Sequence, residues 1–289
     1  MGFGYLTNDL ADRKKDALAG KSNGTANLSA TSIVFLVIAF LATAILPWLY
    51  LPMDEVSVVC IFAELGLFVL YAFPPFRLKE RGILGVVADA LYAHVVPGFL
   101  ASWTFYLIGD KSYDDFFYFI VTLCTWQLFS GVRNIVSHYF KDFENDLASG
   151  TKTFATQIGK DRIYTLMTRV FIPLEVVAAI AFLAIVQMEI GFLFIVVGLF
   201  LMLAWGVFRN GDSDTRAKHF TNTFLDSFYI HWFPYVVIFT LFFRNANFWW
   251  LLVFHFLIFH PAVGRFLRRL TTKKNTSNAS EIPVSYAIL

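Results

Sequence analysis

The chain has 289 residues, of which 57% are hydrophobic and 15% charged, and its mean hydropathy is +0.62. This balance excludes a water-soluble domain and indicates an integral membrane protein that crosses the bilayer several times. A formal net charge of only +2 gives no reason to expect nucleic acid as a partner. The two cysteines, Cys60 and Cys124, lie in apolar runs, which argues against a disulfide framework and a cysteine-based metal site.

The first predicted element is a polar helical segment that precedes any apolar run. Asn8, Asp12 and Asp16 lie four residues apart in it, and Gly20 follows after four more. On a helix this spacing places the three side chains in one slowly winding stripe, from which their oxygens could converge on one cation. We assign residues 1–28 as a cytoplasmic segment that carries this first Asp motif.

Eight apolar runs follow that are long enough to cross the hydrocarbon core of a bilayer. They cover residues 29–51, 56–73, 83–108, 116–138, 163–187, 190–208, 222–243 and 247–264. They predict an all-α, polytopic transmembrane helical bundle over residues 29–264 and a polar, disordered cytoplasmic tail over 265–289.

The distribution of positive charge predicts the orientation of the bundle. If residue 1 is cytoplasmic, all 23 Lys and Arg residues except Lys111, Arg169 and Arg244 fall on the cytoplasmic side. The positive-inside rule favours this choice. We therefore expect a multi-pass protein of the cell's inner or plasma membrane, with its acidic motifs facing the cytoplasm.

A basic loop connects the second and third spans. Pro74 and Pro75 end the second span, and Arg77, Lys79 and Arg81 follow before the next helix begins. Guanidinium and ammonium groups bind diphosphate oxygens well. Topogenic positive charge explains the same residues without a ligand, and the loop alone does not distinguish the two interpretations.

A second acidic stretch after the fourth span repeats the spacing of the first. It contains Asn134, His138, Asp142, Asp146 and Gly150, again at intervals of four. When the glycines are aligned, Asp142 matches Asp12, Asp146 matches Asp16 and His138 matches Asn8. A solvated, salt-bridged surface explains either stretch alone, but the repeat indicates a duplicated helix pair with two carboxylate stripes at one membrane face. Hard oxygen ligands of this kind suit Mg²⁺, which often bridges carboxylates to substrate phosphates.

Taken together, "NDLADRKKD", "YAFPPFRLKERG" and "KDFENDLASGTKTFATQIG" resemble the UbiA superfamily of intramembrane prenyltransferases, over roughly residues 5–245. The NxxxDxxxD signature of the family matches Asn8, Asp12 and Asp16, and its DxxxD signature matches Asp142 and Asp146. The resemblance implies a bundle of about nine transmembrane helices, of which about seven to eight fall in this chain.

The resemblance also implies a site and a reaction. Two Mg²⁺ ions bound by Asn8, Asp12, Asp16, Asp142 and Asp146 would hold the diphosphate of a prenyl donor. Arg77, Lys79, Arg81, Lys152 and Tyr71 would contact the same diphosphate, and a hydrophobic or aromatic acceptor would attack the allylic carbon. Asp12, Asp16, Asp142 and Asp146 are the expected catalytic groups, and His138 is a candidate for contacting the acceptor or assisting proton removal.

Two departures from the family pattern bear on activity and acceptor. Two helices precede the first motif in the family, whereas seven residues precede Asn8 here, so we expect a chain that lacks two helices and has weak or no activity. The run "AGKSNGTANLS" differs from the Arg-Pro-Leu-Pro-Ser-Gly-like run of many quinone-pathway members, which argues against a quinone acceptor by default. Two alternatives stay open: a transferase that makes a polyprenyl-phosphate-linked sugar, and a non-catalytic or transport-type membrane protein with the same fold.

Overall fold

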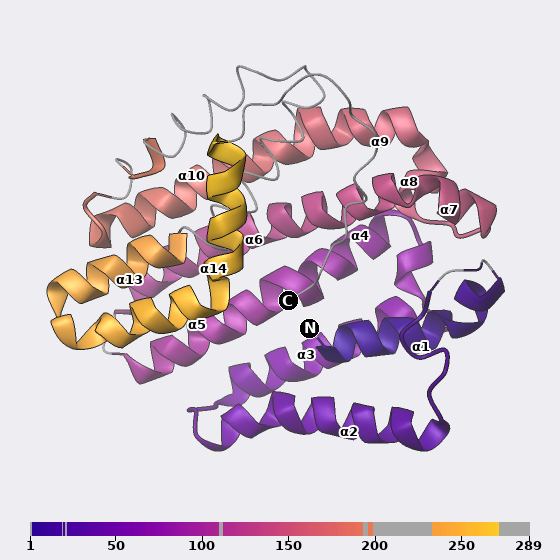
Figure 1. Ribbon diagram of the computed structural model, residues 1–289, viewed down its shortest axis with the longest axis horizontal. Coiled ribbons are helices and arrows are strands. Elements are labelled where there is room, and N and C mark those ends of the chain that lie inside the picture. Colours follow the sequence, from indigo (N-terminus) through magenta and orange to yellow (C-terminus); the bar gives the residue numbers. More distant parts are fainter. Residues whose placement is uncertain are drawn as a thin grey trace. The chain divides into compact units, whose positions relative to one another are not determined.

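The computed structural model describes residues 2–18, 20, 22–109, 112–192, 196–198 and 233–271 (Figure 1). Within these residues every regular element is a helix, which confirms the predicted all-α class. The chain divides into two units, Met1–Val186 and Gln187–Leu289.

Five helical stretches are long and apolar enough to cross a membrane, counted over the residues that the structure describes. They are Ala30–Leu49 (α2, Ala30–Ile45, and η1, Leu46–Leu49), Glu55–Ala72 (α3), Ile83–Ile108 (α4, Ile83–Ala90; η3, Leu91–Val95; α5, Val96–Ile108), Tyr113–Lys141 (α6) and Lys160–Glu189 (α9, Lys160–Leu166; η4, Met167–Phe171; α10, Ile172–Glu189). These are the first five predicted spans, with ends shifted by a few residues.

The second unit contains the helices α13 (Phe233–Arg244), η7 (Ala246–Phe248) and α14 (Trp249–Thr271). These cover the end of the seventh predicted span and all of the eighth. Most of the sixth predicted span, the start of the seventh and residues 272–289 of the predicted tail lie outside the described residues. Residues 265–271, predicted as part of the disordered tail, are instead helical and form the end of α14. The rings of Tyr235 and His255 meet edge to face with their centroids 4.3 Å apart, which joins α13 to α14.

The short polar elements of the first unit gather at one end of its spans. Helix α1 (Gly2–Leu18) packs against α2 and α3, and α7 (Phe143–Ala148) and α8 (Phe154–Ile158) follow the end of α6. The turn η2 (Leu78–Glu80) joins α3 to α4 at the same end, as Figure 1 shows. The basic loop and both acidic motifs therefore lie on one side of the bundle.

The backbone repeats where the sequence repeats. Helix α1 ends at Leu18 and α7 ends at Ala148, and two residues later Gly20 and Gly150 adopt φ values of 65° and 67°. Glycine is favoured at such left-handed helix ends because it has no Cβ. The next spans begin at matching positions, α2 at Ala30 and α9 at Lys160. This agreement supports the predicted duplication, with one difference: the second acidic stripe is broken at Asp142, between α6 and α7.

A compact core fixes the loops that follow α3 and α6. Val86 and Val136 are fully buried between α4 and α6, and Ala155 and Ile163 join them from α8 and α9. Gly85 lets the basic loop lie directly on α4, because a Cβ there would come within 2.7 Å of the Leu78 carbonyl oxygen and 2.9 Å of Lys79 Cα. The packing thus sets where Lys79 is placed.

Candidate active site

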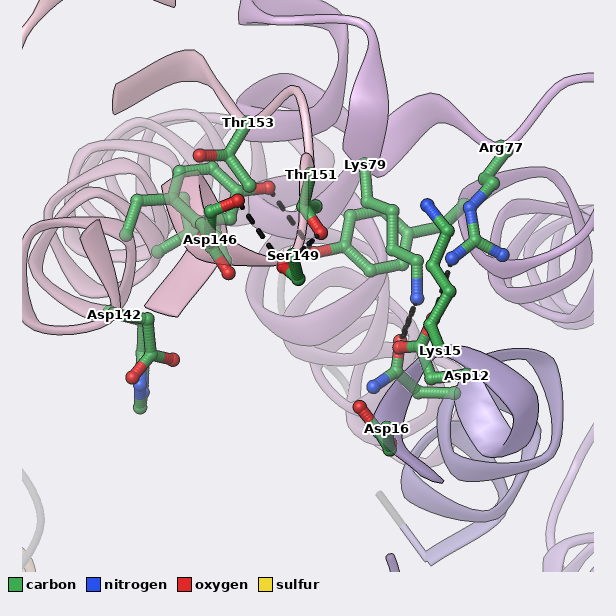
Figure 2. Close-up of a pocket in the computed structure, with 15 residues that line it drawn as sticks. Asp12, Lys15, Asp16, Arg77, Lys79, Asp142, Asp146, Ser149, Thr151 and Thr153 are labelled. Atoms are coloured by element: carbon green, nitrogen blue, oxygen red, sulfur yellow. Dashed lines mark hydrogen bonds and ion pairs between the residues drawn. The ribbon is translucent and has the colours of Figure 1, made fainter. Parts of the chain in front are cut away.

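A cavity of about 270 Å³ opens between α1, the basic loop and the α6–α8 region. Figure 2 shows Asp12, Lys15, Asp16, Arg77 and Lys79 on one side of it, and Asp142, Asp146, Ser149, Thr151 and Thr153 on the other. The rest of the lining comes from Asn8, Tyr71, Ile135, His138 and Tyr139. The two acidic motifs, distant in sequence, thus line one cavity.

Helix α1 supplies the first acidic wall. Asn8, Asp12 and Asp16 all line the cavity, as their four-residue spacing on one helix predicts. The Asn23 side chain donates to Asp16 Oδ2 over 2.7 Å and to the Asp9 carbonyl oxygen over 2.8 Å. The loop after α1 therefore folds back on the helix and holds Asp16 in place.

Asp12 is paired with two cations of the basic loop. Arg77 Nη2 donates to Asp12 Oδ1 over 2.6 Å, and Lys79 donates to Asp12 Oδ2 and, over 2.8 Å, to Asn8 Oδ1. Both side chains are largely buried, with 14% of Arg77 and 9% of Lys79 exposed. The ion pairs are therefore shielded from water and firmly attached to the first motif.

Glu80 orients the Arg77 side chain. It accepts a hydrogen bond from Arg77 Nε over 2.6 Å and forms an ion pair with Lys15. Arg77 has a φ of 40°, an unusual value for a residue with a side chain, and it keeps this conformation while bound to both Asp12 and Glu80. The loop is thus built to point this guanidinium at the cavity.

Burial and ion pairs shift the pKa values of Lys79, Arg77 and Glu80 in the basic loop. Burial lowers the pKa of Lys79, and the Asp12 carboxylate offsets only part of this effect. Burial acts in the same direction on Arg77, but its bonds to Glu80 and Asp12 outweigh it and raise the pKa of the guanidinium. The pKa of Glu80 is lowered, because bonds from Lys15 and Arg77 exceed the opposing effect of burial.

The opposite wall combines two carboxylates with a cluster of hydroxyl groups. Asp142 lies at the junction of α6 and α7, and Asp146 is buried in α7. Ser149 Oγ and Thr151 Oγ1 lie 2.8 Å apart, and Thr153 caps α8 through the backbone N–H of Thr156. Hydroxyl groups of this kind both donate to and accept from phosphate oxygens.

Two tyrosines form a buried part of the lining between these walls. Tyr71 lies near the end of α3 and Tyr139 near the end of α6, and their hydroxyl oxygens are 3.4 Å apart. His138 lines the cavity from the neighbouring position on α6. This part of the cavity combines aromatic surface with a few polar atoms.

The structure brings most of the predicted site residues together. Asn8, Asp12, Asp16, Tyr71, Arg77, Lys79, His138, Asp142 and Asp146 all line the cavity, whereas Arg81 and Lys152 are not among its lining residues. Arg81 donates instead to the Pro75 carbonyl oxygen over 2.9 Å at the surface. The sequence analysis missed Lys15, Tyr139, Ser149, Thr151 and Thr153; the run "SGTKT" directly after the second motif was the available signal for the hydroxyl cluster.

The carboxylates are not arranged as a closed metal site. Across the described part of the chain, no group of three or more His, Cys, Asp or Glu side chains is placed to hold a metal ion together. The donor chemistry nevertheless fits Mg²⁺, because four carboxylates and one amide oxygen line a single cavity. One of these carboxylates, that of Asp12, forms ion pairs with Arg77 and Lys79.

Comparison with known proteins adds the family. A sequence model of the UbiA prenyltransferase family matches residues 1–229. No curated protein and no solved structure matches the chain. The family match covers both acidic motifs, the basic loop and all five described spans. With its apolar helices, the chain is an integral membrane protein, and it belongs to the UbiA prenyltransferase family.

Proposed function

We propose that this protein transfers a prenyl group from a prenyl diphosphate to a hydrophobic or aromatic acceptor within the membrane, with Mg²⁺ as cofactor. The observation that carries the proposal is a single cavity with carboxylates of both motifs, two directed cations and an aromatic wall. The family supports the reaction class.

Asn8, Asp12, Asp16, Asp142 and Asp146 are the proposed metal ligands. All five line the cavity, and their oxygens are the hard donors that Mg²⁺ prefers. The metal would supply positive charge that stabilises the departing diphosphate. The duplicated motif explains why the ligands come from both halves of the first unit.

Arg77 and Lys79 are the proposed diphosphate-binding pair. Both form ion pairs with the Asp12 carboxylate. When a diphosphate enters, we propose that the two cations bind its oxygens and release Asp12 for the metal. Glu80 and Lys15 keep the Arg77 guanidinium in place during this exchange. Arg81 and Lys152 remain predicted contacts that would need the loops to move.

The chemical step follows from this charge arrangement. The carbon–oxygen bond of the donor breaks with its electron pair leaving on the diphosphate, which Arg77 and Lys79 stabilise. Tyr71 and Tyr139 place aromatic surface beside the allylic carbon, where it stabilises cationic character and excludes water. We propose that His138 contacts the acceptor. The acceptor's electron pair then forms the new bond.

The orientation of the site is part of the proposal. Both motifs and the basic loop lie at one end of the first unit. The excess of Lys and Arg at that end supports a cytoplasmic position for the cavity. The predicted location in the inner or plasma membrane follows from the same reasoning.

The test is a transfer assay on the full chain in membranes. Radiolabelled geranyl, farnesyl and longer prenyl diphosphates are supplied with a panel of phenols and with a phosphorylated sugar, in Mg²⁺ or in chelator. We expect label in an organic-soluble product only with Mg²⁺, and loss of that product in Asp12→Asn and in Asp142→Asn. Product formed only from the phosphorylated sugar would replace the proposed acceptor with a sugar.

A matched control separates the site from general effects of charge. Glu144 lies on α7 between Asp142 and Asp146, but its side chain is 72% exposed and bonds to Lys160 outside the cavity. Glu144→Gln should retain wild-type turnover. If Asp12→Asn and Asp142→Asn both retained Mg²⁺-dependent turnover as well, the assignment of the site would be wrong.

A further inference from the structure

A carboxyl group lies within a membrane span of the first unit and has no role in the proposed reaction so far. Asp89 is the seventh residue of the span Ile83–Ile108, about 9 Å from its start at 1.5 Å per residue. Ionisable side chains at such positions are costly and usually serve a function. Asp89 does not line the cavity itself.

Asp89 is bonded to a tyrosine in an irregular turn. The Tyr92 hydroxyl donates to Asp89 Oδ1 over 2.5 Å. Tyr92 belongs to η3 (Leu91–Val95), a π-helical turn that interrupts the span between α4 and α5. Such turns often occur at functional sites, because they re-aim side chains that a regular helix would place elsewhere.

Tyr92 leads from Asp89 to the cavity. Its ring meets the Tyr71 ring edge to face, with centroids 5.2 Å apart. The Tyr71 hydroxyl is in turn 3.4 Å from that of Tyr139, and both of these tyrosines line the cavity. A row of three contacting tyrosine side chains thus connects an intramembrane carboxyl to the wall of the cavity.

We propose that Asp89 takes up, through Tyr92 and the cavity tyrosines, the proton that the acceptor loses when it is prenylated. The proposal rests on the proposed function. As the acceptor's electron pair forms the bond to the allylic carbon and the diphosphate departs, the acceptor's proton passes to the oxygen of Tyr71 or Tyr139. A proton received at Tyr139 is relayed through Tyr71. Tyr71 passes its hydroxyl proton to Tyr92, and Tyr92 passes its own to the Asp89 carboxylate. In total the acceptor loses one proton and the Asp89 carboxylate gains one, while each tyrosine keeps its hydroxyl proton.

The hydrogen bond of Tyr92 gives this row a direction. A tyrosine hydroxyl has one proton to donate, and Tyr92 donates it to Asp89. The lone pairs of the Tyr92 oxygen are therefore available to accept a proton from Tyr71, whose ring packs against the Tyr92 ring. Asp89 does not line the cavity. Its role is to orient the Tyr92 hydroxyl and to take up the proton that the tyrosines relay.

Asp89→Asn separates proton uptake from structure. The amide oxygen can still accept the Tyr92 hydrogen bond, but the amide cannot take up a proton. The assay uses the purified full chain with Mg²⁺, radiolabelled farnesyl diphosphate and the phenol that gives the highest wild-type turnover. We expect kcat to fall about 100-fold, the usual contribution of a general base, while the KM for the donor stays within about twofold. Tyr92→Phe should cause the same loss.

Asp54 offers a matched control. Its carboxylate also accepts hydrogen bonds, from Ser57 and from Trp103 Nε1 at 3.0 Å, but it lies at the start of α3, the opposite end from the cavity. Asp54→Asn should leave kcat unchanged. Binding of Mn²⁺ and donor, measured on each variant by electron paramagnetic resonance, reports whether the cavity has kept its structure.

The pH profile identifies the titrating group. The titratable side chains that face Asp89 are Tyr92 from η3, Tyr71 from α3 and Tyr139 from α6, and tyrosines do not titrate in the acidic range. The wild-type kcat should fall at low pH as Asp89 becomes protonated, and Asp89→Asn should lack that fall. A fall that persists in Asp89→Asn but disappears in His138→Gln would assign proton uptake to His138 and overturn the proposal.

The outcomes distinguish this proposal from the one on which it rests. Wild-type kcat in Asp89→Asn would overturn the role of Asp89 while prenyl transfer stands. Absence of transfer by the wild-type protein with every donor and acceptor would overturn the proposed function itself. If Asp89→Asn did not fold, Tyr92→Phe with intact Mn²⁺ binding would decide the matter by the same comparison of kcat.

Discussion

Asp12 is the residue on which the electrostatics of the site converge. It faces both Arg77 and Lys79 in a setting where all three side chains are mostly removed from water. Removing Asp12 would leave two largely buried cations without their shared carboxylate, which is costly. The Asp12 carboxylate is thus already paired with two cations, so a divalent cation and a diphosphate should bind together more readily than either one alone.

Lys79→Met tests this competition directly. Without the ammonium group, Asp12 has one cation fewer, so we expect the affinity for Mn²⁺ in the absence of donor to rise about tenfold, which corresponds to ~1.4 kcal/mol. The affinity for farnesyl diphosphate should fall, because the anion loses a binding group. Electron paramagnetic resonance of Mn²⁺ and equilibrium binding of labelled donor measure the two effects.

An exposed lysine of the same region provides the control. Lys14 lies on α1 beside Lys15, but it is exposed and does not line the cavity. Lys14→Met should change neither affinity. Weaker Mn²⁺ binding in Lys79→Met would show that Lys79 supports the metal site rather than competing with the metal.

The lowered pKa of Lys79 predicts an alkaline limit for donor binding. The lysine binds diphosphate in its protonated form, so this contribution is complete below its pKa in the folded protein and is lost as the pH rises through it. Since burial places that pKa below the ordinary lysine value, donor affinity should decline at a lower pH than an exposed lysine would cause. Lys79→Arg should move the decline to higher pH, because arginine stays charged. Titration of labelled donor binding between neutral and alkaline pH measures this shift, and identical profiles would exclude Lys79 as the titrating group.

Hydropathy predicts the positions of the membrane spans that consist of a continuous apolar run of sequence. The predicted spans 56–73 and 83–108 correspond to Glu55–Ala72 and Ile83–Ile108. Two π turns within predicted spans were not predicted, because they leave the apolar pattern unchanged: Leu91–Val95 in the span 83–108 and Met167–Phe171 in the span 163–187. The break at Asp142 was also missed, since the four-residue spacing continues across it.

The candidate site could be predicted where it depends on spacing within one helix. The stripe of Asn8, Asp12 and Asp16 is a local property of α1. The pairing of Asp12 with Arg77 joins residues far apart in the chain, so the spacing of residues along the sequence does not predict it. The same limit explains Arg81, which is as basic as Arg77 but turns to the Pro75 carbonyl.

Close contact between α4 and α6 depends on a glycine. A Cβ at Gly131 would come within 2.8 Å of Ala90 Cα on α4, whereas a Cβ at Gly66 on α3 would meet nothing within 4 Å. Gly131→Ala should therefore destabilise the protein by about 1–3 kcal/mol through overpacking. Gly66→Ala should be neutral or stabilising by up to about 1 kcal/mol, because alanine favours the helix. Thermal unfolding in one detergent compares the two variants, and equal melting temperatures would refute the packing argument.

The first unit joins the two halves of the proposed site through its connectivity. Four membrane-crossing stretches separate the first acidic motif from the second, and four is an even number. Both motifs must therefore end on one side of the bilayer, where the connecting loop with Arg77 and Lys79 also emerges. A chain with one crossing more or fewer would place the two acidic walls on opposite faces of the membrane.

Accessibility of introduced cysteines tests this topology in the intact protein. In a background with Cys60→Ala and Cys124→Ala, Ser22→Cys and Lys152→Cys mark the side of the cavity, and Met53→Cys and Ser112→Cys mark the two described loops at the other end. We expect a membrane-impermeant maleimide to label the first pair only in inside-out vesicles and the second pair only in right-side-out vesicles, since the positive charge of the cavity side favours the cytoplasm. Labelling of all four in the reverse sense would invert the orientation but keep the site intact. Labelling of Ser22→Cys and Lys152→Cys from opposite sides would separate Asp12 from Asp142, and a cavity shared by the two motifs could not exist.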